Sequence, residues 1–134
     1  MKNFLPLLIF ALLASSGFAA DRDVYTPEKG SEVRKGIMEG LRQHFSSNII
    51  FVVDELQVRG RFAFAAVSPQ SRDGSRKLET QAGLLYRRPF IESEDAGQNW
   101  IVLTWQPADE DEYEDWWNET VRYFPYAKPL LSEP

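Results

Sequence analysis

The pattern of apolar and polar residues predicts a helix, then four strands, then a second helix. Apolar residues recur every three or four positions from about residue 31 to 45, which indicates an amphipathic helix that Ser31 can cap. A similar spacing follows Pro107 and ends at Pro125. Between the two helices, runs rich in β-branched and aromatic residues predict strands at about 49–58, 61–67, 81–87 and 100–106.

This order of elements predicts the α+β class. We expect an N-terminal helix packed on a curved four-stranded antiparallel sheet, followed by a short C-terminal helix. By analogy, this is the arrangement of cystatin-like or nuclear-transport-factor-like folds, which host many unrelated functions. The tail from residue 126 to 134 is expected to lie along the surface or to be loose.

Two basic residues and two glycines interrupt the apolar face of the first predicted helix. On a helical wheel at about 100° per residue, Arg34 and His44 fall among the apolar side chains. Gly36 and Gly40 lie one above the other at the edge of the same face. Because each glycine costs roughly 1 kcal/mol relative to alanine, they predict a close approach of another backbone.

The first predicted strand contains a matching exception. Its even positions from Ile50 to Val58 are apolar apart from Asp54. An isolated charge in a core is costly, so Asp54 is expected to pair with Arg34 or His44. Two interpretations remain open. The cluster is either an internal ion pair that fixes the docking of helix on sheet, or a pocket lining that receives a polar group of a ligand.

The turn between the first two predicted strands sets their register. Arg59-Gly60 predicts a two-residue turn, in which Asp54 faces Ala65 and Leu56 faces Ala63. A bulge at Gly60 shifts this pairing by one residue.

The first twenty residues have the layout of a secretory signal peptide, with Lys2 near the start, a short apolar run and small residues at the end. The spacing of small residues predicts cleavage after Ala19, with Ala20 as the alternative. The apolar run is too short to span a bilayer, and no cysteine stands near the cleavage site to carry a lipid. We expect a signal peptide at 1–19 and one soluble periplasmic or secreted domain at 20–134, without a membrane span.

Composition excludes several classes of function. The net charge is −5, and it becomes one unit more negative when Lys2 leaves with the signal peptide, so nucleic acid is not an expected partner. The chain has no cysteine and one histidine, which excludes disulfides, thiolate zinc sites and histidine-rich metal sites. We expect no metal and no cofactor.

Sequence motifs for catalysis are weak. His44 and Asp54 with a serine could form a nucleophilic triad, but no serine sits on a strand-to-helix elbow. Asp54 and Glu55 are neighbours on a strand and are expected to point to opposite faces, so they do not form a glycosidase pair. The acidic run 109–115 lacks the glycine turn and terminal glutamate of a calcium loop. It is better interpreted as the solvated start of a helix.

Aromatic residues are dense in the C-terminal part. Helical spacing predicts that Trp116, Trp117 and Val121 pack the second helix on the sheet. Tyr123 and Tyr126 fall outside that stripe and are candidate contact residues for a protein or a glycan such as peptidoglycan.

The segments YTPEKGSEVRKGIMEGLR and FVVDELQVRGRFAFAAVSPQ resemble a group of small exported bacterial proteins without an assigned function. The resemblance covers roughly residues 25–70 and weakens beyond Gly83. The positions that carry it are Tyr25, Pro27, Gly30, Arg34, Leu41, Arg42, Phe51, Val53, Asp54, Gly60, Ala63 and Phe64. The chain departs from the group at Phe62, where tryptophan is usual, and in its longer acidic stretch. The resemblance implies export and one domain, and it implies no reaction.

The function that the sequence favours is an exported, non-catalytic binding or accessory protein of an envelope protein or glycan. Its candidate binding residues are Arg34, His44, Asp54, Tyr123 and Tyr126. One alternative is an inhibitor or immunity protein whose acidic surface meets a cationic envelope enzyme. Another is a small pocket enzyme in which Asp54 and His44 act as acid and base.

Overall fold

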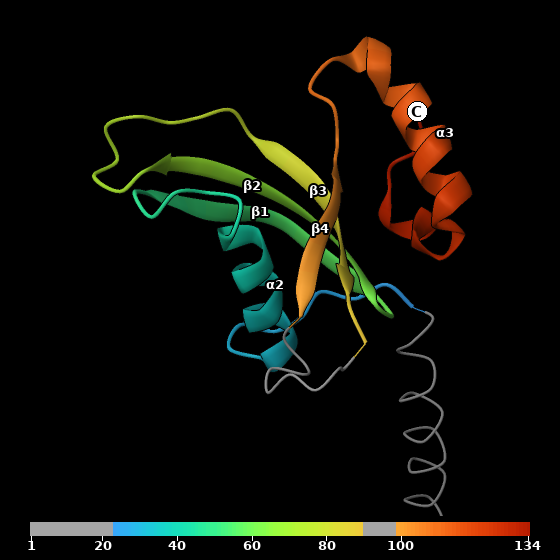
Figure 1. Cartoon of the computed structure of the whole chain (residues 1–134), viewed down its shortest axis with the longest axis horizontal. Coiled ribbons are helices and arrows are strands. Elements are labelled where there is room, and N and C mark those ends of the chain that lie inside the picture. The colour runs from blue at the N-terminus through green and yellow to red at the C-terminus, as the bar shows by residue number, and fades with distance from the viewer. Residues whose placement is uncertain (1–22, 90–98) are drawn as a thin grey trace, which may run out of the picture.

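The computed structural model describes residues 23–89 and 99–134. The predicted signal peptide, 1–19, lies outside the described residues. In chain order the elements are α2 (Glu32–Arg42), β1 (Ile49–Arg59), β2 (Phe62–Ser71), β3 (Gln81–Arg87), β4 (Trp100–Trp105), the 3₁₀ helix η2 (Glu110–Glu112), α3 (Tyr113–Tyr123) and the 3₁₀ helix η3 (Pro125–Leu130) (Figure 1). The predicted α+β class, with a four-stranded antiparallel sheet and a short C-terminal helix, is confirmed.

Helix α2 begins at a side-chain cap and ends earlier than predicted. The Ser31 hydroxyl oxygen accepts a hydrogen bond from the backbone N–H of Arg34 at 3.2 Å, which satisfies one of the free donors of the first turn. The last helical residue is Arg42. His44 follows in a turn, where its N–H donates to the carbonyl oxygen of Leu41 at 3.0 Å. The helical wheel therefore does not apply to His44.

The four strands form a meander in the order β1-β2-β3-β4, with every neighbouring pair antiparallel. Arg59 pairs with Phe62, so the two turn residues are Gly60 and Arg61 instead of the predicted Arg59 and Gly60. Gly60 adopts φ 58°, the left-handed conformation that tight hairpin turns require. As a result Leu56 faces Ala65, and the predicted register is wrong by two residues.

A β-bulge at Asp54 changes which residues of β1 face α2. The strand pairing jumps between Val53 and Glu55, which leaves Asp54 as the extra residue. Before the bulge, Phe51 and Val53 pack toward α2, and after it the even-numbered Leu56 does so. One inserted residue reverses the alternation. The interpretation of Asp54 as a member of the apolar face is therefore wrong.

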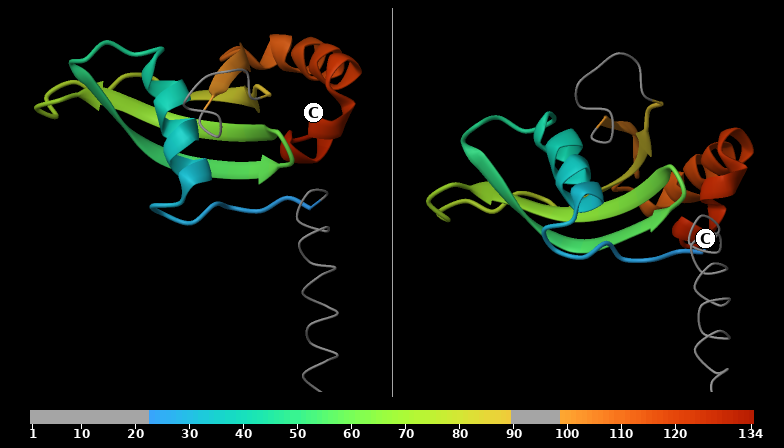
Figure 2. Two further views of the ribbon diagram at one scale, coloured as in Figure 1. Left: turned by 60° about the horizontal axis from the view of Figure 1, so that its bottom comes forward. Right: turned by 90° about the horizontal axis from the view of Figure 1, so that it is seen from below.

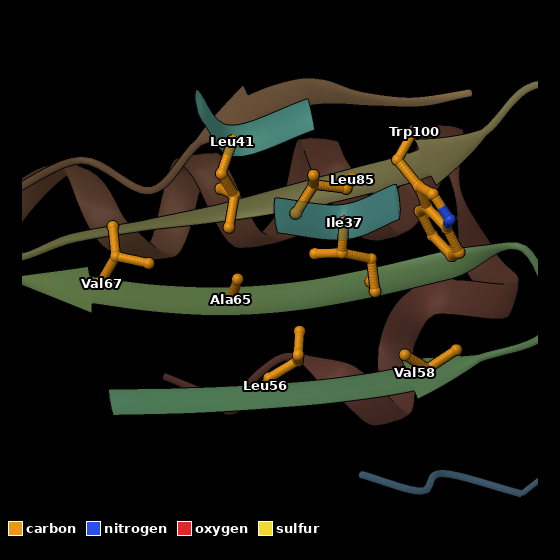
Figure 3. Close-up of a cluster of buried hydrophobic side chains, with 9 residues drawn as sticks. Ile37, Leu41, Leu56, Val58, Ala65, Val67, Leu85 and Trp100 are labelled. Atoms are coloured by element: carbon orange, nitrogen blue, oxygen red, sulfur yellow. The ribbon is translucent and has the colours of Figure 1, made fainter. Parts of the chain in front are cut away.

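Helix α2 packs on one face of the sheet through a helix-side core (Figure 3). The buried members of this core are Ile37, Leu41, Leu56, Val58, Ala63, Ala65, Val67, Leu85 and Trp100. Gly40 touches β4 so closely that an added Cβ would lie 2.5 Å from the carbonyl oxygen of Trp100. The predicted approach of another backbone is thus confirmed at Gly40, and the approaching strand is β4.

Helix α3 and the tail cover part of the opposite face through a tail-side core (Figure 2). Its buried members are Phe64, Leu84, Ala127, Leu130 and Leu131, with Trp116, Trp117 and Val121 packed against them. The predicted role of these last three residues is confirmed. The indole N–H of Trp116 also donates to the Thr104 hydroxyl of β4 at 2.9 Å.

The tail is more ordered than the sequence predicted. Leu130 and Leu131 are 4% and 6% exposed, because they close the tail-side core against the sheet. This burial results from contacts with residues distant in the chain, and no local sequence pattern predicts it. In the described part of the chain, no helix has the length and apolarity needed to cross a bilayer.

Candidate functional site

The structure does not assemble the predicted cluster of Arg34 and Asp54. The partly buried Arg34 guanidinium donates to the carbonyl oxygen of Pro27 at 3.3 Å, which holds the N-terminal segment against α2. Asp54 is exposed and accepts a hydrogen bond from the Ser68 hydroxyl. Within the described residues no ion pair joins Asp54 to Arg34. The predicted pairing is wrong because the bulge turns Asp54 away from the face that α2 covers.

His44 and Asp54 lie at opposite edges of the sheet. His44 is exposed and sits edge-on against Trp105 of β4, with 5.5 Å between ring centroids. Asp54 belongs to β1, the strand at the other edge of the sheet. The two side chains therefore do not form the acid–base pair that a pocket enzyme would need.

Asp54 and Glu55 point to the same side of the sheet, and the prediction of opposite faces is wrong. Asp54 bonds to Ser68, and Glu55 pairs with Ala66. Ser68 and Ala66 are two residues apart on β2, so their side chains share a face. The bulge between Val53 and Glu55 removes the strict alternation on which the prediction relied.

The two predicted contact tyrosines are on the surface. Tyr123 is 65% exposed and Tyr126 is 38% exposed. The guanidinium of Arg59 lies 3.8 Å from the ring centroid of Tyr126, and it also donates to the Tyr126 carbonyl oxygen at 2.6 Å. One ring face of Tyr126 is therefore occupied. The guanidinium of Arg122 lies 5.6 Å from the ring centroid of Tyr123, but Tyr123 is the more exposed of the two and offers the larger aromatic surface to a partner.

A groove of about 690 Å³ opens between the sheet, the start of α3 and the tail. We call it the acidic groove. It is lined by Glu55, Phe64, Ala66, Thr80, Ala82, Gln106, Glu110, Tyr113, Glu114, Ser132, Glu133 and Pro134. Small side chains on two adjacent strands, Ala66 and Ala82, leave the space that a larger residue would fill. The volume is within the range of ordinary ligand sites, roughly 300–1,000 Å³.

The walls of the acidic groove carry one sign of charge. Four carboxylates line it, those of Glu55, Glu110, Glu114 and Glu133, and none of its described lining residues is basic. Aromatic and methyl groups from the strands form the apolar part of the lining. An apolar surface surrounded by carboxylates suits a ligand that has both an apolar part and a positive charge.

Tyr113 fixes the tail at the mouth of the acidic groove. Its hydroxyl donates a hydrogen bond to the carbonyl oxygen of Ser132, which joins the first turn of α3 to the tail. Partial burial raises the pKa of Tyr113 above its usual value. The hydroxyl therefore keeps its proton, and the hydrogen bond, throughout the neutral pH range.

Sequence reasoning missed the acidic groove because its residues come from five separate segments. Glu55 lies beside the bulge, β2 and the start of β3 supply four residues between Phe64 and Ala82, and the others come from residues 106–114 and from the tail. The one available signal was the acidic run 109–115. This run does begin helical structure, with the Asp109 side chain capping η2, and two of its glutamates also face the groove.

The described residues contain no group of three or more histidine, cysteine, aspartate or glutamate side chains that could hold a metal ion.

No protein-family profile, curated protein or solved structure matches the chain.

Proposed function

We propose that this protein is an exported, non-catalytic binding or accessory protein whose acidic groove holds a cationic, partly apolar segment of an envelope protein. The observation that carries the proposal is the groove itself, with its four carboxylates around apolar strand residues and no basic side chain among its described lining. A lysine or arginine side chain satisfies both requirements, because its stem packs on apolar surface while its head meets carboxylates.

The overall charge of the chain supports the same partner. With a net charge of −5, the protein attracts cationic surfaces over a distance of about one Debye length, roughly 8 Å at physiological salt. An inhibitor or immunity protein is the form of this function in which the bound segment belongs to a cationic envelope enzyme. A glycan receives less support, because one ring face of Tyr126 already carries Arg59.

Export, a single domain and membership of the small exported bacterial group remain part of this proposal. The supports are the signal-peptide pattern of residues 1–19 and the segments around Arg34 and Asp54 that carry the resemblance. We also propose a cystatin-like or nuclear-transport-factor-like arrangement, supported by a helix followed by a four-stranded antiparallel meander. In such an arrangement one helix packs on one face of the sheet and the other face is open. Here α3 and the tail cover part of that second face.

The test is calorimetric titration of residues 20–134 with a short extended peptide that contains two arginines flanking leucine residues. The groove variant Glu55→Gln/Glu114→Gln is compared with the equally charged control Glu28→Gln/Glu119→Gln, whose positions are exposed and outside the groove. Removing two exposed charge pairs should weaken binding by roughly tenfold. The control should keep wild-type affinity.

Salt dependence separates a specific site from general attraction. Raised salt should weaken binding to the wild-type protein more than to the groove variant, because the variant has fewer charges at the site. Equal loss of affinity in the groove variant and the control would show that only net charge matters. That outcome, or no binding of the peptide at all, would overturn the proposed function.

A further inference from the structure

The outer edge of β1 is open over its first half. β1 is an edge strand because the sheet order is β1-β2-β3-β4. Tyr25 covers the other end of this edge, where it exchanges hydrogen bonds of 2.9 and 2.7 Å with Val58, and Figure 3 shows the N-terminal segment beside that end. Among residues 23–89 and 99–134, no other segment pairs with this edge.

The backbone groups of the open part point outward. Phe51 faces Pro69, which has no N–H, and the Pro69 carbonyl accepts from Leu78 on the far side of β2. Phe51 and Pro69 therefore form a non-hydrogen-bonded pair, so the N–H and C=O of Phe51 point away from β2. Strand alternation gives Ile49 and Val53 the same orientation. The Ile49 N–H already donates to the Ser46 carbonyl oxygen at 3.0 Å, so the groups offered to a partner strand are those of Phe51 and Val53 and the carbonyl of Ile49.

The side chains of this edge lack the usual protection against pairing. Val52 is 52% exposed, and Ile50 lies on the same face of the strand. Edge strands are commonly protected by lysine, proline, an inward charge or a β-bulge. β1 contains no lysine and no proline from residue 49 to 59, and its bulge lies at Asp54, beyond residues 49–53. The bulge at Asp54 ends the flat part, so residues 49–53 form a short, regular, apolar edge.

Charges of opposite sign lie at the two ends of this flat edge. Arg72 lies at the start of β1, where its backbone N–H donates to Asn48 and its guanidinium donates to the Ser47 carbonyl oxygen at 2.8 Å. Asp54 and Glu55 lie at the other end. An antiparallel partner with the same sequence places its arginine beside these carboxylates. A parallel partner would put like charges together.

We propose that a second copy of this chain binds here, with β1 antiparallel to β1 around a two-fold axis through Phe51. In this arrangement Phe51 faces its own counterpart, and Val52 faces Ile50 of the second copy. The N–H and C=O of Phe51 pair with those of its counterpart, the Val53 N–H faces the Ile49 carbonyl of the second copy, and the exposed Val52 is covered. The interface is self-complementary in hydrogen bonding and charge, as a two-fold dimer requires. The proposal goes beyond the proposed function: the interface uses the edge of β1 at residues 49–53, and of its flanking carboxylates only Glu55 also lines the acidic groove.

Disulfide cross-linking tests the register directly, because the chain has no cysteine of its own. A mixture of Ile50→Cys and Val52→Cys chains should form a cross-linked pair under mild oxidation, since these positions are directly opposite across the axis. Replacing Ile50→Cys by Tyr123→Cys in the mixture is the matched control, because Tyr123 is exposed and lies outside the edge. Cross-linking no faster than in this control would overturn the proposal.

Analytical ultracentrifugation tests the dimer without cysteines. The mature chain should change from monomer to dimer as its concentration rises, and Val52→Lys should raise the dissociation constant by about tenfold. Because Val52 is exposed in the single copy, Val52→Lys should keep its fold, which circular dichroism can verify. Glu119→Lys, an exposed change on α3, should leave the dissociation constant unaltered. A wild-type chain that stays monomeric at every concentration, or a Val52→Lys chain that dimerises equally well, would overturn the proposal.

Discussion

Replacing Gly40 with alanine tests how closely α2 lies against β4. A Cβ at position 40 would lie 2.5 Å from the carbonyl oxygen of Trp100 and 3.1 Å from its carbonyl carbon, and Cβ contacts under 3.0 Å essentially never occur. The obstacle is backbone, so no side-chain rotation removes the clash. Helix and strand would have to move apart.

Two opposing terms set the magnitude. Alanine is better than glycine in a helix by about 1 kcal/mol. Overpacking a tight contact costs about 1–3 kcal/mol, and moving α2 away from β4 also loosens the packing of Ile37 and Leu41, which are both 0% exposed. The steric term is the larger one, so we expect Gly40→Ala to lower the free energy of unfolding by about 1–2 kcal/mol.

Urea unfolding followed by circular dichroism measures this change. Lys35→Ala, an exposed substitution on the same helix, is the control and should stay within about 0.5 kcal/mol of the wild type. If Gly40→Ala proves as stable as the wild type or more stable, then α2 does not lie against the backbone of β4 as described.

Two further predictions concern hydrogen bonds. Thr104→Val removes the acceptor of the Trp116 indole N–H at 2.9 Å and should lower the free energy of unfolding by about 1 kcal/mol; unchanged urea unfolding would contradict this. Hydrogen bonds from the Ser75 backbone N–H and from the Ser75 and Ser71 hydroxyls lower the pKa of Asp73 from 3.8 to about 2. The ionised Asp73 therefore contributes its whole stabilisation to the fold at pH values well above 3.8, and this contribution is lost as the pH falls through about 2. NMR titration of the Asp73 carboxyl carbon should show a midpoint near 2, and a midpoint near 3.8 would contradict the prediction.

The sequence predicted the elements well because their signals are local. The strand at 81–87 coincides with Gln81–Arg87, and the helix capped by Ser31 begins where it was expected. The unusual Gly40 correctly indicated a close backbone contact, since a glycine inside a helix needs a packing reason.

The bulge and the tail are the features that the sequence could not predict. A bulge adds one residue on one strand. The apolar residues of β1 occupy both odd and even positions, so the sequence does not say which set faces the core until the pairing with the neighbouring strand is known. The bulge moved Asp54 from the predicted core to the surface and separated it from Arg34. The tail is part of the core because Leu130 packs in one cluster with Phe64 and Leu84. These residues are far apart in the chain, so no local pattern predicts their packing.

The most direct test of the proposed function is to map where a cationic peptide binds, by ¹⁵N NMR titration of residues 20–134. We expect the largest shift changes at the backbone amides of Ala66, Ala82 and Gln106, which line the acidic groove, and we expect Glu55→Gln/Glu114→Gln to need about tenfold more peptide for the same changes. Changes centred instead on Tyr123 or on Arg34, or spread evenly over all acidic residues, would contradict the account.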